Sequence, residues 1–209
     1  MMKRNALIVN LSIFVVLNVV RFMFVGVALP NPAFYLLFNI VFIVLNSLVM
    51  VFAAEKVSVF HAKLLENKKR FFIGIVCVLC VWFVNQIVSV VASKFSGTFI
   101  TCALSSLVLI LPWVLIVVVL LKAYRLSLKK SPVVILSVIV SLITLAIYFG
   151  LTYSLTLQTN EMMNSNSSDL FVFIQMTNNL RMIGNVGSIC EMIIGATAVL
   201  SISFAENKN

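Results

Sequence analysis

The sequence predicts an all-α, polytopic membrane protein with six transmembrane helices and both termini in the cytoplasm. Three observations predict this fold: the composition, six long apolar runs and the placement of the basic residues. Of the 209 residues, 62% are hydrophobic and only 10% are charged, and the mean hydropathy is +1.17. Soluble domains are about half apolar and about a quarter charged. A soluble fold of this length could not bury so much apolar surface, so we expect residues 1–209 to form a single transmembrane domain in a lipid bilayer.

Six apolar stretches are long enough to cross the hydrocarbon core, which takes about 20 residues in a helix. Pro30 and Pro32 mark the first turn, Gly97 marks the third, and Pro132 marks the start of the fifth span. The runs do not alternate apolar and polar residues as barrel strands do, so helices are expected. The six predicted spans are residues 5–29, 33–54, 71–93, 99–121, 132–157 and 180–204.

Basic residues set the predicted orientation. Lys94 and Arg181 lie on one side of the predicted spans, and the other side carries twelve: Lys3, Arg4, Lys56, Lys63, Lys68, Lys69, Arg70, Lys122, Arg125, Lys129, Lys130 and Lys208. Because cytoplasmic flanks carry the excess of Lys and Arg, both termini are expected inside, in a bacterial-type cytoplasmic membrane. The net charge of +9 follows this loop pattern, so it gives no reason to expect a nucleic-acid partner.

Two connections between spans are long. Segment 55–70 places apolar residues at helical spacing against lysines, which predicts a cytoplasmic amphipathic helix. It either anchors to anionic lipid or docks a cytosolic partner through Phe60, His61, Leu64, Lys68, Lys69 and Arg70. Segment 158–179 is expected to be an external loop. Its first half is polar, and its apolar stretch "LFVFIQM" is expected to lie on the outer face or to dip into it.

Arg21 interrupts the first apolar run, and a bare guanidinium in hydrocarbon costs several kcal/mol or more. Glu191, in the last run, is the only acidic residue inside a predicted span. At a rise of about 1.5 Å per residue, Arg21 lies about 6 Å outside the membrane midplane and Glu191 within about 2 Å of it. An ion pair between them is therefore predicted, provided that the first and last helices are neighbours.

Further polar residues fall at similar depths. Gly187 and Gly195 flank Glu191 at a spacing of four, which predicts close packing of this face against another helix. One interpretation is structural, with each interhelical contact contributing about 0.5–2 kcal/mol. The other is a polar binding cavity in the outer half of the membrane, used for a substrate, an ion or a peptide. Besides the ion pair, its candidate residues are Asn18, Asn39, Asn85, Gln86, Asn185 and Ser188.

Signatures of catalysis and of metal or cofactor binding are missing from the sequence. His61 is the only histidine, and there is no HExxH, GxSxG or Walker lysine motif. No catalytic residue, metal site or cofactor is therefore predicted. The string "CVLC", from Cys77 to Cys80, resembles the dithiol of DsbB-type membrane oxidoreductases. It is embedded in apolar residues, so the cysteines are interpreted as small buried hydrophobes.

The layout of six spans, the cytoplasmic segment "EKVSVFHAKLLENKKR" and a semi-apolar last outer loop resembles that of ABC-2-type exporter permeases. The six-span substrate-binding subunits of energy-coupling-factor importers have a similar topology. The resemblance implies a membrane subunit of a transport or export system, with a cytosolic ATPase as a possible protein partner. Two alternatives stay open: an accessory or scaffold protein that packs against a larger complex, and an intramembrane enzyme that acts through Arg21 and Glu191.

Overall fold

The computed structural model describes residues 2–25, 32–60, 68–92, 94–95, 97–128, 131–164 and 170–207. In this part of the chain there are six helices and two short strands: α1 (Met2–Val25), α2 (Pro32–Glu55), α3 (Lys68–Ala92), α4 (Thr98–Ala123), β1 (Leu126–Ser127), α5 (Pro132–Asn164), α6 (Leu170–Phe204) and β2 (Glu206–Asn207). Each helix is long and apolar enough to cross a membrane. The predicted class is confirmed, and the chain is an integral, multi-pass membrane protein.

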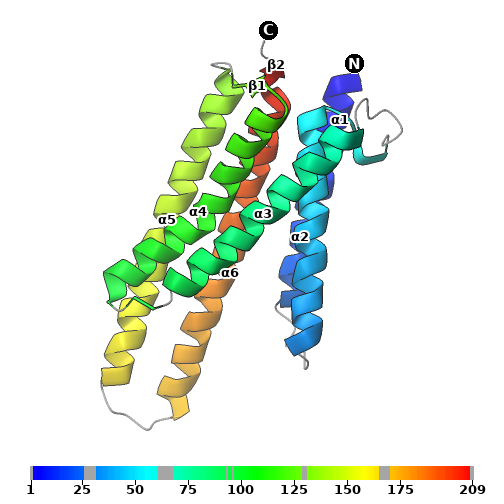
Figure 1. Ribbon diagram of the computed structural model, residues 1–209. Coiled ribbons are helices and arrows are strands. Elements are labelled where there is room, and N and C mark those ends of the chain that lie inside the picture. The colour runs from blue at the N-terminus through cyan, green and yellow to red at the C-terminus, as the bar shows by residue number, and fades with distance from the viewer. Residues whose placement is uncertain are drawn as a thin grey trace.

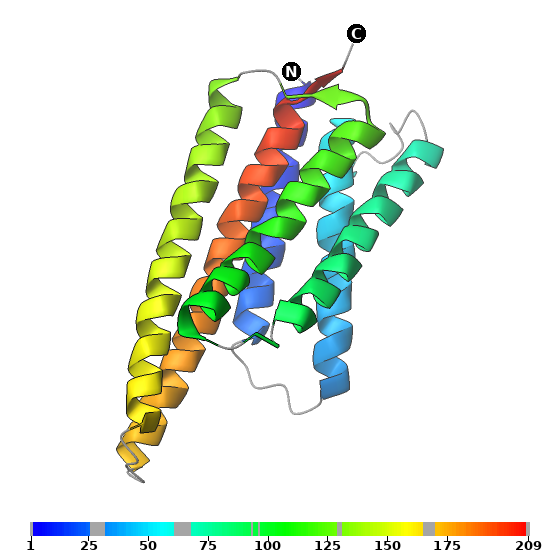
Figure 2. The same ribbon diagram turned by 60° about the vertical axis from the view of Figure 1, so that its left-hand side comes forward.

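The helices run alternately up and down, and both termini lie at the same end of the bundle (Figures 1 and 2). Helix α6 packs against α1, α2, α4 and α5, whereas α3 packs against α2 and α4. Pro32 and Pro132 are the first residues of α2 and α5, where the missing N–H of proline removes no helical hydrogen bond. Lys56 and Arg125 have φ values of 57° and 51° and lie just after the ends of α2 and α4. The left-handed backbone at these two residues stops each helix.

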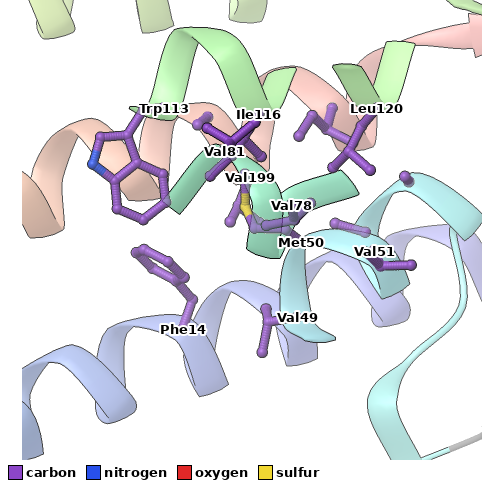
Figure 3. Close-up of a cluster of buried hydrophobic side chains, with 14 of the residues drawn as sticks. Phe14, Val49, Met50, Val51, Val78, Val81, Trp113, Ile116, Leu120 and Val199 are labelled. Carbon is purple, nitrogen blue, oxygen red and sulfur yellow. The ribbon is translucent and has the colours of Figure 1, made fainter. Parts of the chain in front are cut away.

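The apolar core lies in the half of the bundle nearer the termini. Figure 3 shows Phe14 of α1 directed toward Trp113 of α4, with ring centroids 5.6 Å apart in an edge-to-face arrangement. The ring of Trp82 on α3 also packs edge-to-face against the Trp113 ring, with the two centroids 5.3 Å apart. A Cβ on Gly195 of α6 would clash with Phe14 and would lie 2.8 Å from the Trp113 ring, so only glycine fits there. The close-packing stripe predicted on the last helix is therefore present.

Polar contacts secure the end of the bundle that carries the termini. Arg70 lies over the Tyr124 ring, and its Nε donates to the Ala123 carbonyl at 3.3 Å. The Tyr124 hydroxyl donates to the Arg70 carbonyl at 3.2 Å. Burial, and then the Glu55 carboxylate, raises the pKa of Tyr124, which keeps its hydroxyl protonated as a donor. Nearby, β1 and β2 pair antiparallel, an element that the sequence patterns did not predict.

Segment 55–70 differs from the predicted amphipathic helix in its described part. Helix α2 ends at Glu55, and Lys56 turns away with a positive φ. The Asn10 side chain then accepts from the Val59 N–H at 3.1 Å and donates to the Val57 carbonyl at 2.9 Å. These contacts satisfy backbone groups that a continuing helix would have used. Residues 61–67 lie outside the described part.

The external loop predicted at 158–179 is wrong in extent, because α5 continues to Asn164 and α6 begins at Leu170. The apolar stretch from Leu170 to Met176 forms the first turns of α6. Polar side chains stabilise this extension: Asn179 donates to Thr159 at 3.5 Å, and Asn160 donates to Thr98 at 2.9 Å. At about 1.5 Å per residue, helices of 33 and 35 residues exceed a hydrocarbon core of about 30 Å. Both views show α5 and α6 extending past the other helices (Figures 1 and 2).

Replacing Gly195 by alanine should lower the thermal unfolding temperature of the purified protein in detergent. The added methyl group has no room between Phe14 and Trp113, and overpacking costs about 1–3 kcal/mol. Gly150→Ala is the matched control, because a Cβ there meets nothing within 4 Å. That variant should unfold at the wild-type temperature or above it, since alanine favours the helix. Equal unfolding temperatures for the two variants would contradict the packing described for α1, α4 and α6.

Candidate functional site

The first and last helices are joined by the predicted ion pair. Nη1 of Arg21 on α1 donates to Oε1 of Glu191 on α6 at 3.2 Å. The side chains keep 27% and 21% of their surface exposed, so neither charge is sealed in the protein. Helices α1 and α6 pack against each other, which is the condition that the prediction required. The two charges compensate each other within the membrane, where an isolated charge would destabilise the fold.

A cavity of about 720 Å³ lies beside this ion pair, and all six helices contribute to its wall. Its volume is within the range of small-molecule sites, about 300–1,000 Å³. The wall combines charged, amide, hydroxyl, aromatic and aliphatic groups. Its residues are Arg21, Asn39, Ile40, Ile43, Trp82, Asn85, Gln86, Ser89, Ala92, Thr101, Leu104, Ser105, Val108, Leu109, Pro112, Tyr148 and Glu191.

Two helices each present one continuous face to the cavity. Consecutive lining residues are one or three positions apart on both helices, from Trp82 to Ala92 on α3 and from Thr101 to Pro112 on α4. Such spacings place side chains on one side of a helix. The wall extends about 15 Å along α3 at the helical rise of about 1.5 Å per residue. Ala92 and Thr101 lie where α3 ends and α4 begins, at the end of the bundle opposite the termini (Figure 2).

One amide oxygen in the wall lacks a hydrogen-bond donor among the described residues. The Asn85 side chain is buried, with the residue 7% exposed, and its Oδ1 accepts no hydrogen bond from the described residues. A buried acceptor without a donor costs about 1–3 kcal/mol. Pro112, in the facing wall on α4, has no N–H to donate to the carbonyl of Val108 one turn earlier. Among the described residues, the Asn85 oxygen is therefore an acceptor in the wall that the fold leaves without a donor.

The remaining polar candidates divide into two groups. Asn39, Asn85 and Gln86 line the cavity together with the ion pair. Asn18 instead donates to the Phe14 carbonyl at 2.8 Å and to Asn46 Oδ1 at 3.1 Å, so it ties α1 to α2. Asn185 and Ser188 are half-buried on α6 and do not line the cavity, and the Ser188 hydroxyl donates to the Gly184 carbonyl at 3.1 Å.

The sequence patterns missed several lining residues. Ser89 follows Asn85 by four positions, and Ser105 follows Thr101 by four, so both pairs share a helix face. This spacing was a usable signal for the polar stripe on α3 and α4. Tyr148, from α5, gave no such signal because it is isolated among apolar residues.

The candidate docking residues are only partly described. Phe60 is 77% exposed, and Lys68 and Lys69 at the start of α3 are exposed as well. Arg70 is half-buried and engaged with Tyr124 and Ala123. His61 and Leu64 lie outside the described residues.

The cysteines and acidic residues show no redox or metal site in the described part of the chain. Its four cysteines are free thiols, and it contains no group of three or more His, Cys, Asp or Glu residues that could hold a metal ion. Cys102 and Cys190 are buried, as interpreted from the sequence. For Cys80 that interpretation is wrong, because its side chain is exposed on the apolar outer surface of α3, and Cys77 is only half-buried.

Comparisons of the chain with protein-family models, with curated proteins and with solved structures find no match. A function for this chain is therefore inferred from the geometry of the cavity and its ion pair.

Proposed function

We propose that the chain is a membrane subunit of a transport or export system of a bacterial cytoplasmic membrane, and that the cavity beside Arg21 and Glu191 is its ligand-binding site. The observation that carries the proposal is a cavity of about 720 Å³ whose wall includes both members of an ion pair placed within the spans. Ionisable residues inside a membrane commonly mark a substrate or ion pathway.

The cavity favours this function over that of a purely structural scaffold. In a scaffold, the polar residues would lie sealed between helices, and a buried ion pair is stabilising only when its remaining hydrogen-bonding groups are satisfied. Here Arg21 and Glu191 keep part of their surface exposed, and Asn85 Oδ1 lacks a donor among the described residues. These groups suit a site that a polar ligand or water completes.

The uneven packing of the bundle also supports transport. The half near the termini holds a continuous apolar core around Trp113, and the polar cavity occupies the opposite half. With the orientation predicted from the basic residues, the site would be closed toward the cytoplasm and placed in the outer half. Such an arrangement is expected of one state of an alternating-access cycle.

A thiol-labelling experiment tests whether the cavity is hydrated. In a background without the native cysteines, Ser105→Cys should react with a membrane-impermeant maleimide at least about ten-fold faster than Leu107→Cys. Thiolate, the reactive species, forms in water and not in lipid. Ser105 lines the cavity, whereas Leu107, two residues later on α4, is 56% exposed on the outer surface. Equally slow labelling of both positions would mean a dry cavity and would refute the proposed binding site.

Neutral variants separate the ion pair's structural role from its role in binding. Arg21→Gln and Glu191→Gln alone each leave one uncompensated charge, which costs about 3–5 kcal/mol when buried and less here because both side chains are partly exposed. The double variant should regain most of the thermal stability but should not restore transport of the native substrate. If the double variant supports wild-type activity in cells, the pair serves only to hold α1 and α6 together.

The candidate docking residues for a cytosolic ATPase are Phe60, His61, Leu64, Lys68, Lys69 and Arg70, and we propose that the exposed side chains of Phe60, Lys68 and Lys69 contact it. Purification of the wild-type chain in mild detergent should recover that ATPase, and the double variant Lys68→Glu/Lys69→Glu should reduce its recovery about ten-fold by reversing the local charge. Lys94→Glu, at the opposite end of α3, is the control. Recovery of a large membrane complex without an ATPase would instead favour the accessory-protein alternative.

A further inference from the structure

The charges of the cavity wall restrict the ligand that it can hold. Among the described residues that line it, Arg21 and Glu191 are the only charged ones, so the wall is neutral overall. A singly charged ligand would bind the oppositely charged member of the ion pair. The remaining side chain would then lack a counter-charge in a low-dielectric environment, which is unfavourable. The cavity therefore favours a ligand without net charge.

The ion pair offers hydrogen-bonding groups of both signs to such a ligand. Arg21 and Glu191 are joined by one contact, Nη1 to Oε1, and not by the two parallel bonds of a bidentate pair. A guanidinium carries further N–H donors in a planar fork that matches a carboxylate or a phosphate, and a carboxylate has a second oxygen that accepts from an ammonium. Both side chains line the cavity, so these groups are presented side by side.

Asn85 adds a requirement for a donor. Its Oδ1 is buried in the wall without a hydrogen bond from the described residues, and an ammonium carries three N–H donors of the kind that this oxygen accepts. A neutral polyol could also donate to Asn85, but it would gain less from two opposite charges placed next to each other. A ligand with an anion and an ammonium uses all three groups.

We propose that the cavity binds a zwitterionic group, in which an oxyanion contacts Arg21 and a primary ammonium contacts Glu191 and Asn85. This inference rests on the proposed function of the cavity as a binding site. The aliphatic part of the wall, which includes Ile40, Ile43, Leu104, Val108 and Leu109, suits an apolar remainder of the same molecule. Two sources share this chemistry: the headgroup of an aminophospholipid and a free amino acid with an apolar side chain.

Binding of defined probes to the wild-type protein tests the proposal and separates the two sources. Native mass spectrometry would compare retention of phosphatidylethanolamine, phosphatidylglycerol and phosphatidylcholine. Thermal unfolding would compare leucine with leucinamide, isocaproate and sorbitol, which are cationic, anionic and neutral. We expect phosphatidylethanolamine or leucine, or both, to bind at least about ten-fold more tightly than the singly charged probes. Phosphatidylcholine should be retained less than phosphatidylethanolamine because its quaternary ammonium has no N–H donor.

Each outcome decides between the alternatives. Preference for phosphatidylethanolamine alone supports a lipid ligand, and preference for leucine alone supports a free amino acid. Equal or tighter binding of a singly charged probe, binding of sorbitol alone, or no binding by any probe would overturn the zwitterion proposal. In those cases rapid labelling of Ser105→Cys would leave the proposed binding site standing, whereas a dry cavity would remove both.

An asparagine variant locates the bound group. Asn85→Leu removes the unpartnered oxygen and keeps the number and branching of the side-chain heavy atoms, so it should keep the fold and weaken binding of the preferred zwitterion about ten-fold. Asn185→Leu, on α6 and away from the cavity wall, is the matched control and should bind as the wild type does. Undiminished binding by Asn85→Leu would exclude the proposed ammonium contact. Should that variant fail to fold, the probe series on the wild-type protein still decides the proposal.

Discussion

The structure depends on one constraint: a guanidinium placed in an apolar helix keeps its charge, so it needs an anion at the same depth. Arg21 and Glu191 are 170 residues apart in the sequence, and their pairing holds the first helix against the last. The same helix surfaces allow close approach, because Gly195 leaves room for Phe14 and Trp113, and Gly187 faces Tyr148. Helix α6 packs against α1, α2, α4 and α5, and is the central helix of the bundle. The ion pair and these two glycines of α6 both favour this close packing.

The two halves of the bundle follow different packing rules. Near the termini, aromatic and branched aliphatic side chains fill the space between the helices, and the side chains of Asn10 and Tyr124 form hydrogen bonds with backbone atoms. In the opposite half, α3 and α4 turn amides and hydroxyls toward a space that no described side chain fills. In lipid, the hydrophobic effect does not drive helices together, so helix association depends on packing and hydrogen bonds. Here the packed core near the termini holds the helices together, and the other half of the bundle can keep a cavity.

Much of the fold could be predicted because its signals are local. The length of each apolar run predicted the six spans, and counting residues along them predicted depths for Arg21 and Glu191 that differ by about one helical turn. The spacing of Ser89 and Ser105 from Asn85 and Thr101 indicates shared helix faces, but whether those faces line one cavity depends on packing between distant segments. The polar stretch after residue 157 has the composition of a loop, and hydrogen bonds such as that from Asn160 to Thr98 join helices that sequence patterns treat separately. Asn18 is buried in a contact with Asn46 and does not line the cavity. Sequence patterns alone could not distinguish these two positions for a polar residue inside a span.

The short antiparallel ladder between β1 and β2 has a mechanical consequence. It fastens the segment after α6 to the segment after α4, with Leu126 opposite Asn207 and Ser127 opposite Glu206. Helix α6 carries Glu191, and helix α4 carries much of the cavity wall. The ladder therefore joins the terminal ends of two helices that line the cavity. Separating α4 and α6 at their terminal ends would therefore break the backbone hydrogen bonds of this ladder.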